Sequence, residues 1–175
     1  MSFVQSLRAA TAVDHQGVDD RFGGFVLDDV GDYRRFLLAH ARALPAVEAA
    51  LAADGGDGDD GLPTWRARAG LLAEDLARLG AAMPLPLPFA VGGAARWGAL
   101  YVIEGSRLGG QLLARGVPAG SPLAYLAARH QSGEWRALLG AIDVRAAAAD
   151  DAWRTAAIDG ARATFALYGV AADVG

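Results

Sequence analysis

Apolar side chains recur every three or four residues along most of this chain, and that spacing predicts helices throughout. The first helix is expected to build its inner face from five residues: Leu7, Thr11, His15, Val18 and Phe22. No stretch alternates apolar and polar residues as a half-buried strand would. With 175 residues and 53% hydrophobic content, the chain can bury one sizeable core. We therefore expect an all-α fold in a single domain, 1–175.

Glycine, proline and capping residues divide the helical pattern into segments. Gly23-Gly24 is expected to end the first helix, and Asp32 to open a second helix that Pro45 kinks. Two segments are predicted to be non-helical: the acidic, glycine-rich loop Asp54–Pro63 and the proline-alternating stretch Met83–Phe89. Five further helices are expected: about Trp65–Leu79, about Gly93–Ala114, 122–129 after a Ser121 cap, 133–144, and one from Asp150 or Asp151 to about Tyr168-Gly169.

Composition excludes several classes of function. The chain has no cysteine, which rules out disulfides, thiolate catalysis and cysteine-ligated metal centres. Its net charge is −4 and its arginines are not clustered, so we expect no nucleic-acid partner. No apolar run approaches the roughly 18 residues of a membrane span, and the start MSFVQSLRAA does not resemble a secretion signal. A cytoplasmic location without membrane contact is therefore expected.

His15 lies on the apolar face of the first predicted helix, where a lone histidine is usually a structural residue. Asp19 follows four residues later, one turn on and on the same face. A carboxylate there can accept one imidazole N–H and orient the other nitrogen, as metal-ligating histidines require. Arg8, seven residues earlier, returns to nearly the same face about 10 Å along the axis. A macrocycle ligated at His15 could extend an anionic edge that far.

The longest apolar helix contains interior glycines at Gly105, Gly109 and Gly110, within YVIEGSRLGGQLLARG, Tyr101–Gly116. Each costs about 1 kcal/mol relative to alanine, which indicates that something approaches the backbone closely. One interpretation is helix–helix contact through a groove of small residues, since two of the glycines are four apart. The other is a flat ligand lying against the backbone. The glycines alone favour helix contact, and both interpretations stay open.

Taken together, the two stretches resemble the haem oxygenase family, and more closely the bacterial type found with bacteriophytochromes. The resemblance is carried by LRAAT…H…D over Leu7–Asp19 and by YVIEGSRLGGQ over Tyr101–Gln111. Weaker matches follow in the expected order and extend the resemblance over nearly the whole chain: TWRARAGLLAEDLARLG at Thr64–Gly80, GEWRALL at Gly133–Leu139 and ARATFALYG at Ala161–Gly169.

This resemblance implies a compact helical fold that holds haem between the first helix and a kinked, glycine-rich helix. His15 would be the proximal iron ligand and Asp19 its acidic partner. Gly105 and Gly109 would lie closest to the distal face of the macrocycle and, with the intervening Ser106, form the candidate catalytic segment. Three further positions match residues that contact haem: Arg8 and Arg136 at the propionates, and Phe165 on the macrocycle.

The chain departs from the family pattern at two positions. Ser106 follows the first distal glycine, where mammalian-type members have an Asp that orders water beside bound dioxygen; bacterial relatives commonly lack it too. A serine hydroxyl or a pocket water would have to donate the hydrogen bonds instead. Ala12 stands where the family often has a second basic residue. Propionate anchoring would then rely on Arg136, which could change the meso carbon that is attacked.

The activity implied by the resemblance is oxidative cleavage of haem at a meso carbon to biliverdin, CO and ferrous iron. Dioxygen and external electrons are needed, because the chain has no flavin or nicotinamide fingerprint. Expected partners are haem, an electron donor such as a ferredoxin or a flavoprotein reductase, and a bacteriophytochrome as biliverdin acceptor. Two alternatives stay open: a carrier or sensor that binds haem through His15 without turnover, and a di-iron oxidase with inward Glu and His ligands.

The remaining polar and aromatic residues receive structural interpretations. His40 is expected at the surface, and His130 at the end of a short helix, where it would favour the helix dipole. Glu104 is expected near the distal region, either as a cap or interhelical hydrogen-bond partner or as a proton relay. The tryptophans are expected mostly in the core by their helical spacing: Trp65, Trp97, Trp135 and Trp153.

Overall fold

The computed structural model describes residues 1–53 and 61–174, and these residues are helical without any strand. The elements are α1 (Phe3–Ala10), α2 (Ala12–Phe22), α3 (Val30–Ala52), α4 (Ala69–Arg78), α5 (Ala95–Leu113), the short 3₁₀ helix η1 (Ala114–Gly116), α6 (Glu134–Ala147) and α7 (Asp151–Asp173). Within this described part, no helix combines the length and apolar character needed to cross a membrane. Most of the predicted acidic loop, 54–60, lies outside the described residues.

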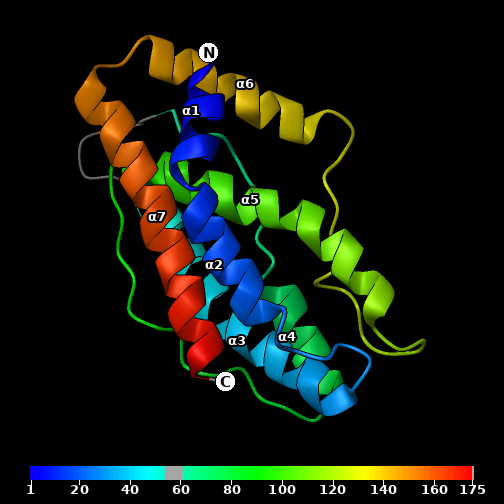
Figure 1. The fold of residues 1–175 in the computed structure, drawn as a ribbon. Coiled ribbons are helices and arrows are strands. Elements are labelled where there is room, and N and C mark those ends of the chain that lie inside the picture. The colour runs from blue at the N-terminus through cyan, green and yellow to red at the C-terminus, as the bar shows by residue number, and fades with distance from the viewer. Residues whose placement is uncertain (54–60, 175) are drawn as a thin grey trace.

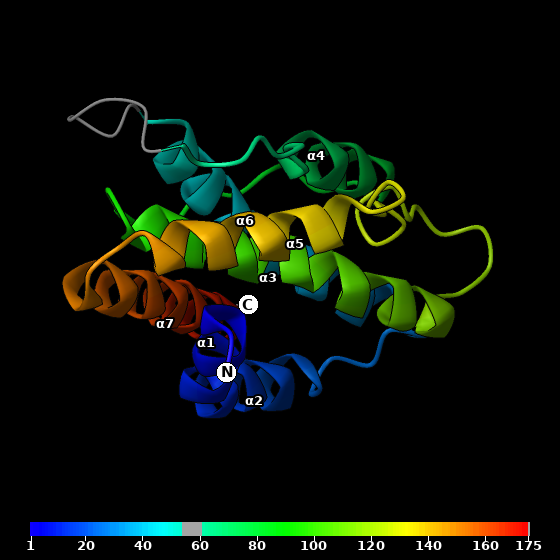
Figure 2. The same cartoon turned by 90° about the horizontal axis from the view of Figure 1, so that it is seen from above.

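The long helices α3, α5 and α7 pack on one another and form the centre of the molecule. Figure 1 shows α6 across the end that holds the N-terminus, while α7 runs down to the other end. In Figure 2, α1 and α2 lie on one side of this centre and α4 on the opposite side. Both α2 and α5 pack on α7, so α7 fixes the position of the His15 helix relative to the glycine-rich helix.

Helices α5 and α7 cross at two glycines, where their backbones touch. A Cβ built on Gly98 would lie 1.8 Å from the carbonyl oxygen of Ala157, and one on Gly160 would lie 2.0 Å from that of Ala95. Such separations exclude any side chain at either position. The crossing fixes the two helices at backbone contact about two turns before Gly105.

The first helix is two helices rather than the single one predicted. Thr11 separates α1 from α2 with φ −110° and ψ 6°, and its hydroxyl donates to the carbonyl of Leu7 at 2.9 Å. Leu7 and Thr11 are buried and Val18 and Phe22 are partly buried, as expected for an inner face. The prediction that His15 belongs to this inner face is wrong, because its side chain is exposed on α2. The prediction that Gly23 ends the helix is confirmed.

The start of α4 depends on a carboxylate that lies far away in the sequence. The predicted helix start near Trp65 is wrong: α4 begins at Ala69, because Glu48 of α3 accepts hydrogen bonds from the backbone N–H of Arg68 at 2.6 Å and of Ala69 at 3.2 Å. Helix α3 starts at Val30, slightly before the predicted residue, and continues through Pro45.

The predicted helix over 122–129 is also wrong, because this segment forms turns. The fully buried carboxylate of Asp75 accepts from the N–H groups of Ala124 at 3.0 Å and Tyr125 at 2.9 Å, so these donors are satisfied without a helix. The predictions for α5, for α6 and for an extended Met83–Phe89 are confirmed.

Helix α7 has the predicted start but not the predicted end. Asp150 caps it by accepting from the N–H of Trp153 at 2.8 Å. The helix does not stop at Tyr168-Gly169 but continues to Asp173. Gly169 is a contact residue rather than a helix end, because a Cβ there would lie 3.6 Å from the guanidinium of Arg21.

Candidate functional site

His15 and Asp19 form a pair on the outer part of α2. His15 Nδ1 lies 2.9 Å from Asp19 Oδ2, and the two side chains are 61% and 56% exposed. When Nδ1 donates to the carboxylate, Nε2 carries the lone pair that a metal requires. Within the described residues, no hydrogen bond engages Nε2. The predicted pairing therefore exists.

Phe165 links the His15 helix to the glycine-rich helix. Its ring lies 5.5 Å from the His15 ring in an edge-on arrangement. On its other side Phe165 packs with Leu7 of α1, Val102 of α5 and Ala161 of α7 in a small buried cluster. The same aromatic side chain thus supports the histidine and contacts α5 one turn before Gly105.

Gly105 and Gly109 do not serve helix packing. A Cβ on Gly109 would meet nothing within 4 Å, and one on Gly105 would meet only Cη2 of Trp135, at 3.5 Å. The third interior glycine does pack, because a Cβ on Gly110 would lie 3.2 Å from the carbonyl oxygen of Leu126. The structure thus leaves the backbone of α5 open at two of the three glycines, as a flat ligand would require.

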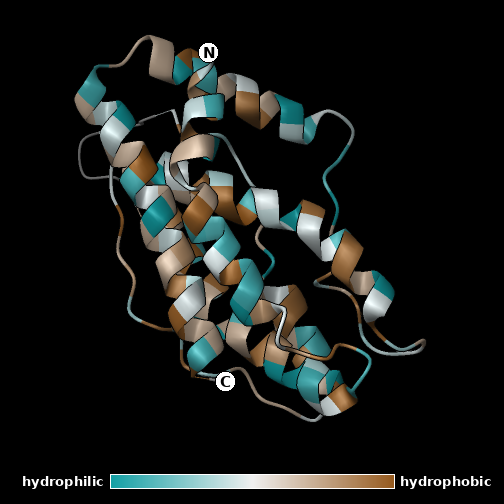
Figure 3. Ribbon diagram, viewed as in Figure 1, coloured by the Kyte–Doolittle hydropathy of each residue, from teal (hydrophilic) through white to brown (hydrophobic). Residues whose placement is uncertain are grey.

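Exposed apolar side chains surround this open strip. Leu108, Leu112 and Leu113 are 47%, 65% and 40% exposed, although they belong to an otherwise well-packed helix. Figure 3 shows the hydrophobic residues at this end of α5, away from the crossing with α7. Apolar surface beside exposed backbone is typical of a site for a large apolar ligand.

Ser106 lies beside the strip, and its hydroxyl is already hydrogen-bonded. Its Oγ donates to the carbonyl of Ile103 at 2.7 Å and accepts from Nη2 of Arg68 at 2.8 Å. The single proton of Ser106 is therefore directed into the protein. It reaches a ligand on the strip only if the hydroxyl rotates or a water intervenes.

Buried charges support α5 from within. Arg107 is 1% exposed and holds Glu104 with two hydrogen bonds, Nε to Oε2 at 2.8 Å and Nη2 to Oε1 at 3.0 Å. It also donates to the carbonyl of Arg66, and the buried Arg68 donates to the carbonyl of Ile103. Glu104 is thus held in an ion pair within α5, which is neither the cap nor the interhelical hydrogen bond predicted for it.

Both other histidines differ from their predictions. His130 does not end a helix; its buried ring lies with Nε2 3.2 Å from Glu104 Oε2. His40 is not at the surface, because it lies among the rings of Phe22, Phe36 and Tyr168 and pairs with the hydroxyl of Tyr125. Burial, helped by the positive charge of Arg68, lowers the pKa of His40 to about 3, so it is neutral at physiological pH.

Both predicted propionate contacts, Arg8 and Arg136, stay predictions. Arg8 is exposed on α1. Burial raises the pKa of Tyr101, four residues before Gly105, and the positive charge of Arg8 opposes the rise. Arg136 is exposed on α6, and in the described part of the chain it makes no ion pair or hydrogen bond with another site residue. Sequence reasoning missed Tyr101, although its four-residue spacing from Gly105 places it on the open face.

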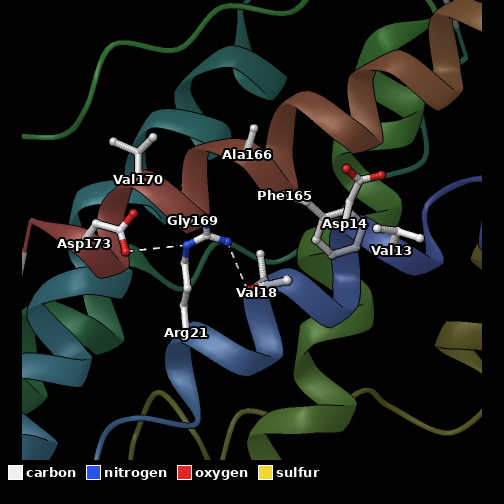
Figure 4. A pocket seen from close by; sticks show the side chains of 10 residues that line it. Val13, Asp14, Val18, Arg21, Phe165, Ala166, Gly169, Val170 and Asp173 are labelled. Atoms are coloured by element: carbon white, nitrogen blue, oxygen red, sulfur yellow. Dashed lines mark hydrogen bonds and ion pairs between the residues drawn. The ribbon is translucent and has the colours of Figure 1, made fainter.

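A groove of about 320 Å³ lies on another side of α2, between α2 and α7 (Figure 4). Arg21 crosses it, with Nε 3.5 Å from Asp173 and Nη1 donating to the carbonyl of Gly17 at 3.1 Å. Phe165 contributes to its wall, but His15 and Asp19 do not line it. We therefore assign the groove no part in the site.

The residues present suit haem. The histidine–carboxylate pair offers one imidazole nitrogen without a hydrogen bond, and the open strip admits a flat ring against the backbone. By contrast, residues 1–53 and 61–174 hold no group of three or more His, Asp and Glu side chains placed for a metal ion. The di-iron alternative thus finds no ligand set there. This helical fold, one oriented histidine and an open helix backbone are the features that a protein binding an iron macrocycle through a single histidine would need.

Comparison with known proteins agrees with this class. No family model matches the chain. A curated relative from Xanthomonas campestris pv. campestris (strain 8004), named "Heme oxygenase", is 38% identical over 158 residues, covering 80% of this chain and 88% of the relative. The chain therefore belongs to the haem oxygenase family.

Two solved structures share the fold. The heme oxygenase of Neisseria meningitidis, in its NO- and CO-bound forms, has a TM-score of 0.83 at 24% identity, covering 99% of this chain and 92% of that one. The heme oxygenase of Leptospira interrogans has a TM-score of 0.74 at 18% identity, covering all of both chains.

Proposed function

We propose that this member of the haem oxygenase family is an enzyme that cleaves haem at a meso carbon to biliverdin, CO and ferrous iron. The observation that carries the proposal is the His15–Asp19 pair, 2.9 Å apart, with the second imidazole nitrogen exposed. Asp19 and Phe165 would hold the imidazole in one tautomer and one orientation. The open strip at Gly105 and Gly109 supports the same assignment on the opposing helix.

Bound haem would supply both the iron that activates dioxygen and the carbon that is oxidised. In this role His15 would bind iron through Nε2, and Asp19 would keep the proton on Nδ1. Gly105 and Gly109 would let the ring contact the helix backbone, and this close contact would exclude bulk water from that face. Arg8 pairs with a propionate, and we keep Arg136 as a second propionate contact that needs its exposed side chain to turn towards the site.

External partners complete the reaction. Dioxygen is the co-substrate, and the electrons come from a separate donor such as a ferredoxin or a flavoprotein reductase. Support for a separate donor comes from the described residues, which include no strand and therefore no strand–glycine loop–helix unit for a nucleotide cofactor. A bacteriophytochrome that accepts biliverdin is a further proposed partner, based on the resemblance of the sequence to that bacterial type.

A hemin titration tests the assignment of the site. Wild-type protein should give a Soret band that saturates at one equivalent, and His15→Ala should lose it. Asp19→Asn should keep binding but weaken it about 10- to 100-fold, as loss of a ligand-orienting carboxylate does. A Soret band unchanged in His15→Ala would remove His15 as the ligand. The matched control is His40→Gln, which removes a buried imidazole away from the site.

The alternative is a haem carrier or sensor, and no observation favours it over the enzyme. The hydroxyl of Ser106 is held by Ile103 and Arg68, so a distal hydrogen bond from it needs a rotation of the hydroxyl or an intervening water. Ascorbate with catalase separates the two functions. Loss of the Soret band with growth of biliverdin absorption supports the enzyme. Stable His15-dependent binding without bleaching, both with ascorbate and with a ferredoxin pair, supports the carrier.

A further inference from the structure

Although the groove between α2 and α7 is no part of the haem site, it lies beside the helix that carries His15. Helix α2 has no buried residue of its own. It follows the buried Thr11, and Phe22 at its other end packs on Phe36 and His40 of α3. Between these two ends α2 faces α7 across the groove, so core packing restrains this stretch less than its ends.

Glycines lie on both sides of the groove, Gly17 on α2 and Gly169 on α7. At the crossing of α5 with α7, a Cβ on Gly98 would lie 1.8 Å from the backbone of the other helix. Here the helices stay apart. A Cβ on Gly169 would have the guanidinium of Arg21 as its nearest neighbour, at 3.6 to 3.8 Å, and one on Gly17 would meet only Arg21 Nη1, at 3.5 Å. The arginine therefore occupies the space into which the two glycine-lined faces could otherwise close.

Arg21 is attached to both helices. Its Nη1 donates to the carbonyl of Gly17 on α2 at 3.1 Å, and its Nε lies 3.5 Å from Asp173 Oδ1 on α7 (Figure 4). The planar guanidinium, with its fixed donor directions, gives this spacer a defined width. Because the ion pair is half-exposed, it contributes little to stability, and its effect is on the distance between the helices.

A second ion pair, of reversed polarity, joins the same two helices further towards their starts. Asp14 Oδ2 on α2 lies 3.8 Å from Nε of Arg162 on α7, whose Nη2 also donates to the carbonyl of Ala10 at 3.2 Å. Along the chain α2 thus offers an acid and then a base, and α7 a base and then an acid. His15 lies between Asp14 and Arg21 in the sequence, so the two pairs restrain the stretch that carries it.

The distance between α2 and α7 determines the surroundings of His15. Its ring contacts the edge of the Phe165 ring, which belongs to α7, at 5.5 Å. A movement of α2 towards α7 would change this contact and turn the imidazole, and with it the direction of Nε2. Asp19 cannot correct such a movement, because it lies on α2 and moves with the histidine.

We propose that Arg21 is a positioning residue: as a spacer between α2 and α7, secured by Asp173, it sets the orientation in which His15 is presented to iron. This inference rests on the proposed function, because it takes His15 as the iron ligand. Arg21 acts through the position of the helix, since its contacts are with Gly17 and Asp173 rather than with the histidine.

The test compares Arg21→Ala with wild type and with Arg35→Ala, which removes an arginine of similar exposure that pairs with Asp32 near the start of α3. The main readout is the iron–histidine stretching band in the resonance Raman spectrum of the ferrous haem complex, which reports the bond to His15 rather than the stability of the fold. In Arg21→Ala this band should shift and broaden. Hemin affinity should fall by about tenfold, the lower end of the loss for groups that orient a metal ligand. Arg35→Ala should change neither.

Rescue distinguishes a spacer from a residue that only stabilises the fold. Guanidinium ion, added well below the concentration that unfolds the protein, can enter the space that the missing side chain leaves. It should return the band of Arg21→Ala towards that of wild type, whereas NaCl at equal ionic strength should not. Asp173→Asn, which keeps the arginine but weakens its attachment to α7, should shift the band in the same direction by a smaller amount.

A wild-type band in both Arg21→Ala and Asp173→Asn would overturn the proposal. So would a shifted band in Arg21→Ala that guanidinium restores no more than NaCl does. A wild type that fails to bind hemin, or a Soret band that His15→Ala leaves unchanged, would instead contradict the proposed function.

Discussion

The two halves of α5 both depend on glycine, but for opposite reasons. At Gly98, in the first half, a Cβ would lie 1.8 Å from a carbonyl oxygen of α7, so the glycine allows two helices to touch. At Gly109, in the second half, a Cβ would meet nothing within 4 Å. Stability therefore explains the first glycine and cannot explain the second, which costs helix stability without improving any contact in the protein.

The halves also differ in what holds them. The first half is fixed by shape, through backbone contact with α7. The second half is held from within by buried charges: Arg68 on the carbonyl of Ile103, and Arg107 on Glu104. A helix face left open for a ligand cannot be fixed by packing on that face, so its support has to come from the opposite side.

The largest expected effect is on the packed half. Gly98→Ala should destabilise the haem-free protein by about 3 kcal/mol or more, because the added methyl overlaps backbone that cannot move aside without separating α5 from α7. In a chain of 175 residues that corresponds to a fall in Tm of about 6 to 12 °C. Thermal unfolding followed by circular dichroism measures it.

Gly160→Ala tests the same crossing from the other helix, since its Cβ would lie 2.0 Å from the carbonyl oxygen of Ala95. A loss of similar size is expected. If both variants unfold within 2 °C of wild type, by the order-of-magnitude scale above, the helices do not cross at backbone contact and the contrast between the two halves is lost.

Sequence spacing could single out the open glycines in the second half of α5, but not the packed Gly98 in the first half. The glycines of the second half were recognisable because they interrupt an apolar helix that also resembles a known motif. Gly98 has an equally visible position in the sequence, but its partner Gly160 lies 62 residues away, and no local pattern pairs them. Contacts between distant segments decide which glycine packs and which stays open.

The same limit explains the other differences. The His15–Asp19 pair was predictable because four residues along a helix bring side chains together. His40 and His130 were misjudged, because their partners, Tyr125 and Glu104, are distant in sequence. The start of α4 was misplaced for a similar reason, since a carboxylate of α3 caps it.

The next effect concerns the support of the open half. Ser106→Ala removes one acceptor from the guanidinium of Arg68 but leaves its bond to the carbonyl of Ile103. We expect a loss of about 1 to 2 kcal/mol, the cost of a buried donor with one partner fewer. Urea unfolding measures it, with Ser132→Ala, an exposed loop position, as control. A loss no larger than that of the control would mean that Arg68 does not depend on Ser106.

A change in the opposite direction is expected at the open glycine. Gly109→Ala should stabilise the haem-free protein by about 0.8 kcal/mol, because alanine favours the helix and the methyl meets nothing. The same methyl should lower hemin affinity by about tenfold, because it separates the ring from the backbone. Gly140→Ala is the matched control: this exposed α6 glycine also has open space at its Cβ, so it should gain stability without losing affinity. Equal hemin affinity in both variants would contradict a ligand on the strip.

The smallest effect is at a surface ion pair next to the buried charges that support α5. It joins Arg66, whose backbone carbonyl accepts from Arg107, to Glu134 at the start of α6. Arg66 lowers the pKa of Glu134 from 4.5 to about 2. Because this folded-state pKa is below the unfolded one, the pair's contribution is complete above about pH 4.5 and is lost as the pH falls towards 2. Both side chains are partly exposed, so Glu134→Gln should cost only about 0.2 to 1 kcal/mol at pH 7.

That cost should shrink at pH 3 and in high salt, because protonation and screening remove the same interaction in wild type. Chemical unfolding of both proteins at pH 7 and pH 3 gives the difference directly, and Asp151→Asn, which breaks the pair between the exposed Asp151 carboxylate and Arg154, is the control. A pH-independent difference would mean that Glu134 acts through its hydrogen bond to the N–H of Gln131 rather than through charge. In that case the ion pair between Arg66 and Glu134 would not contribute to the network of charges that supports the second half of α5.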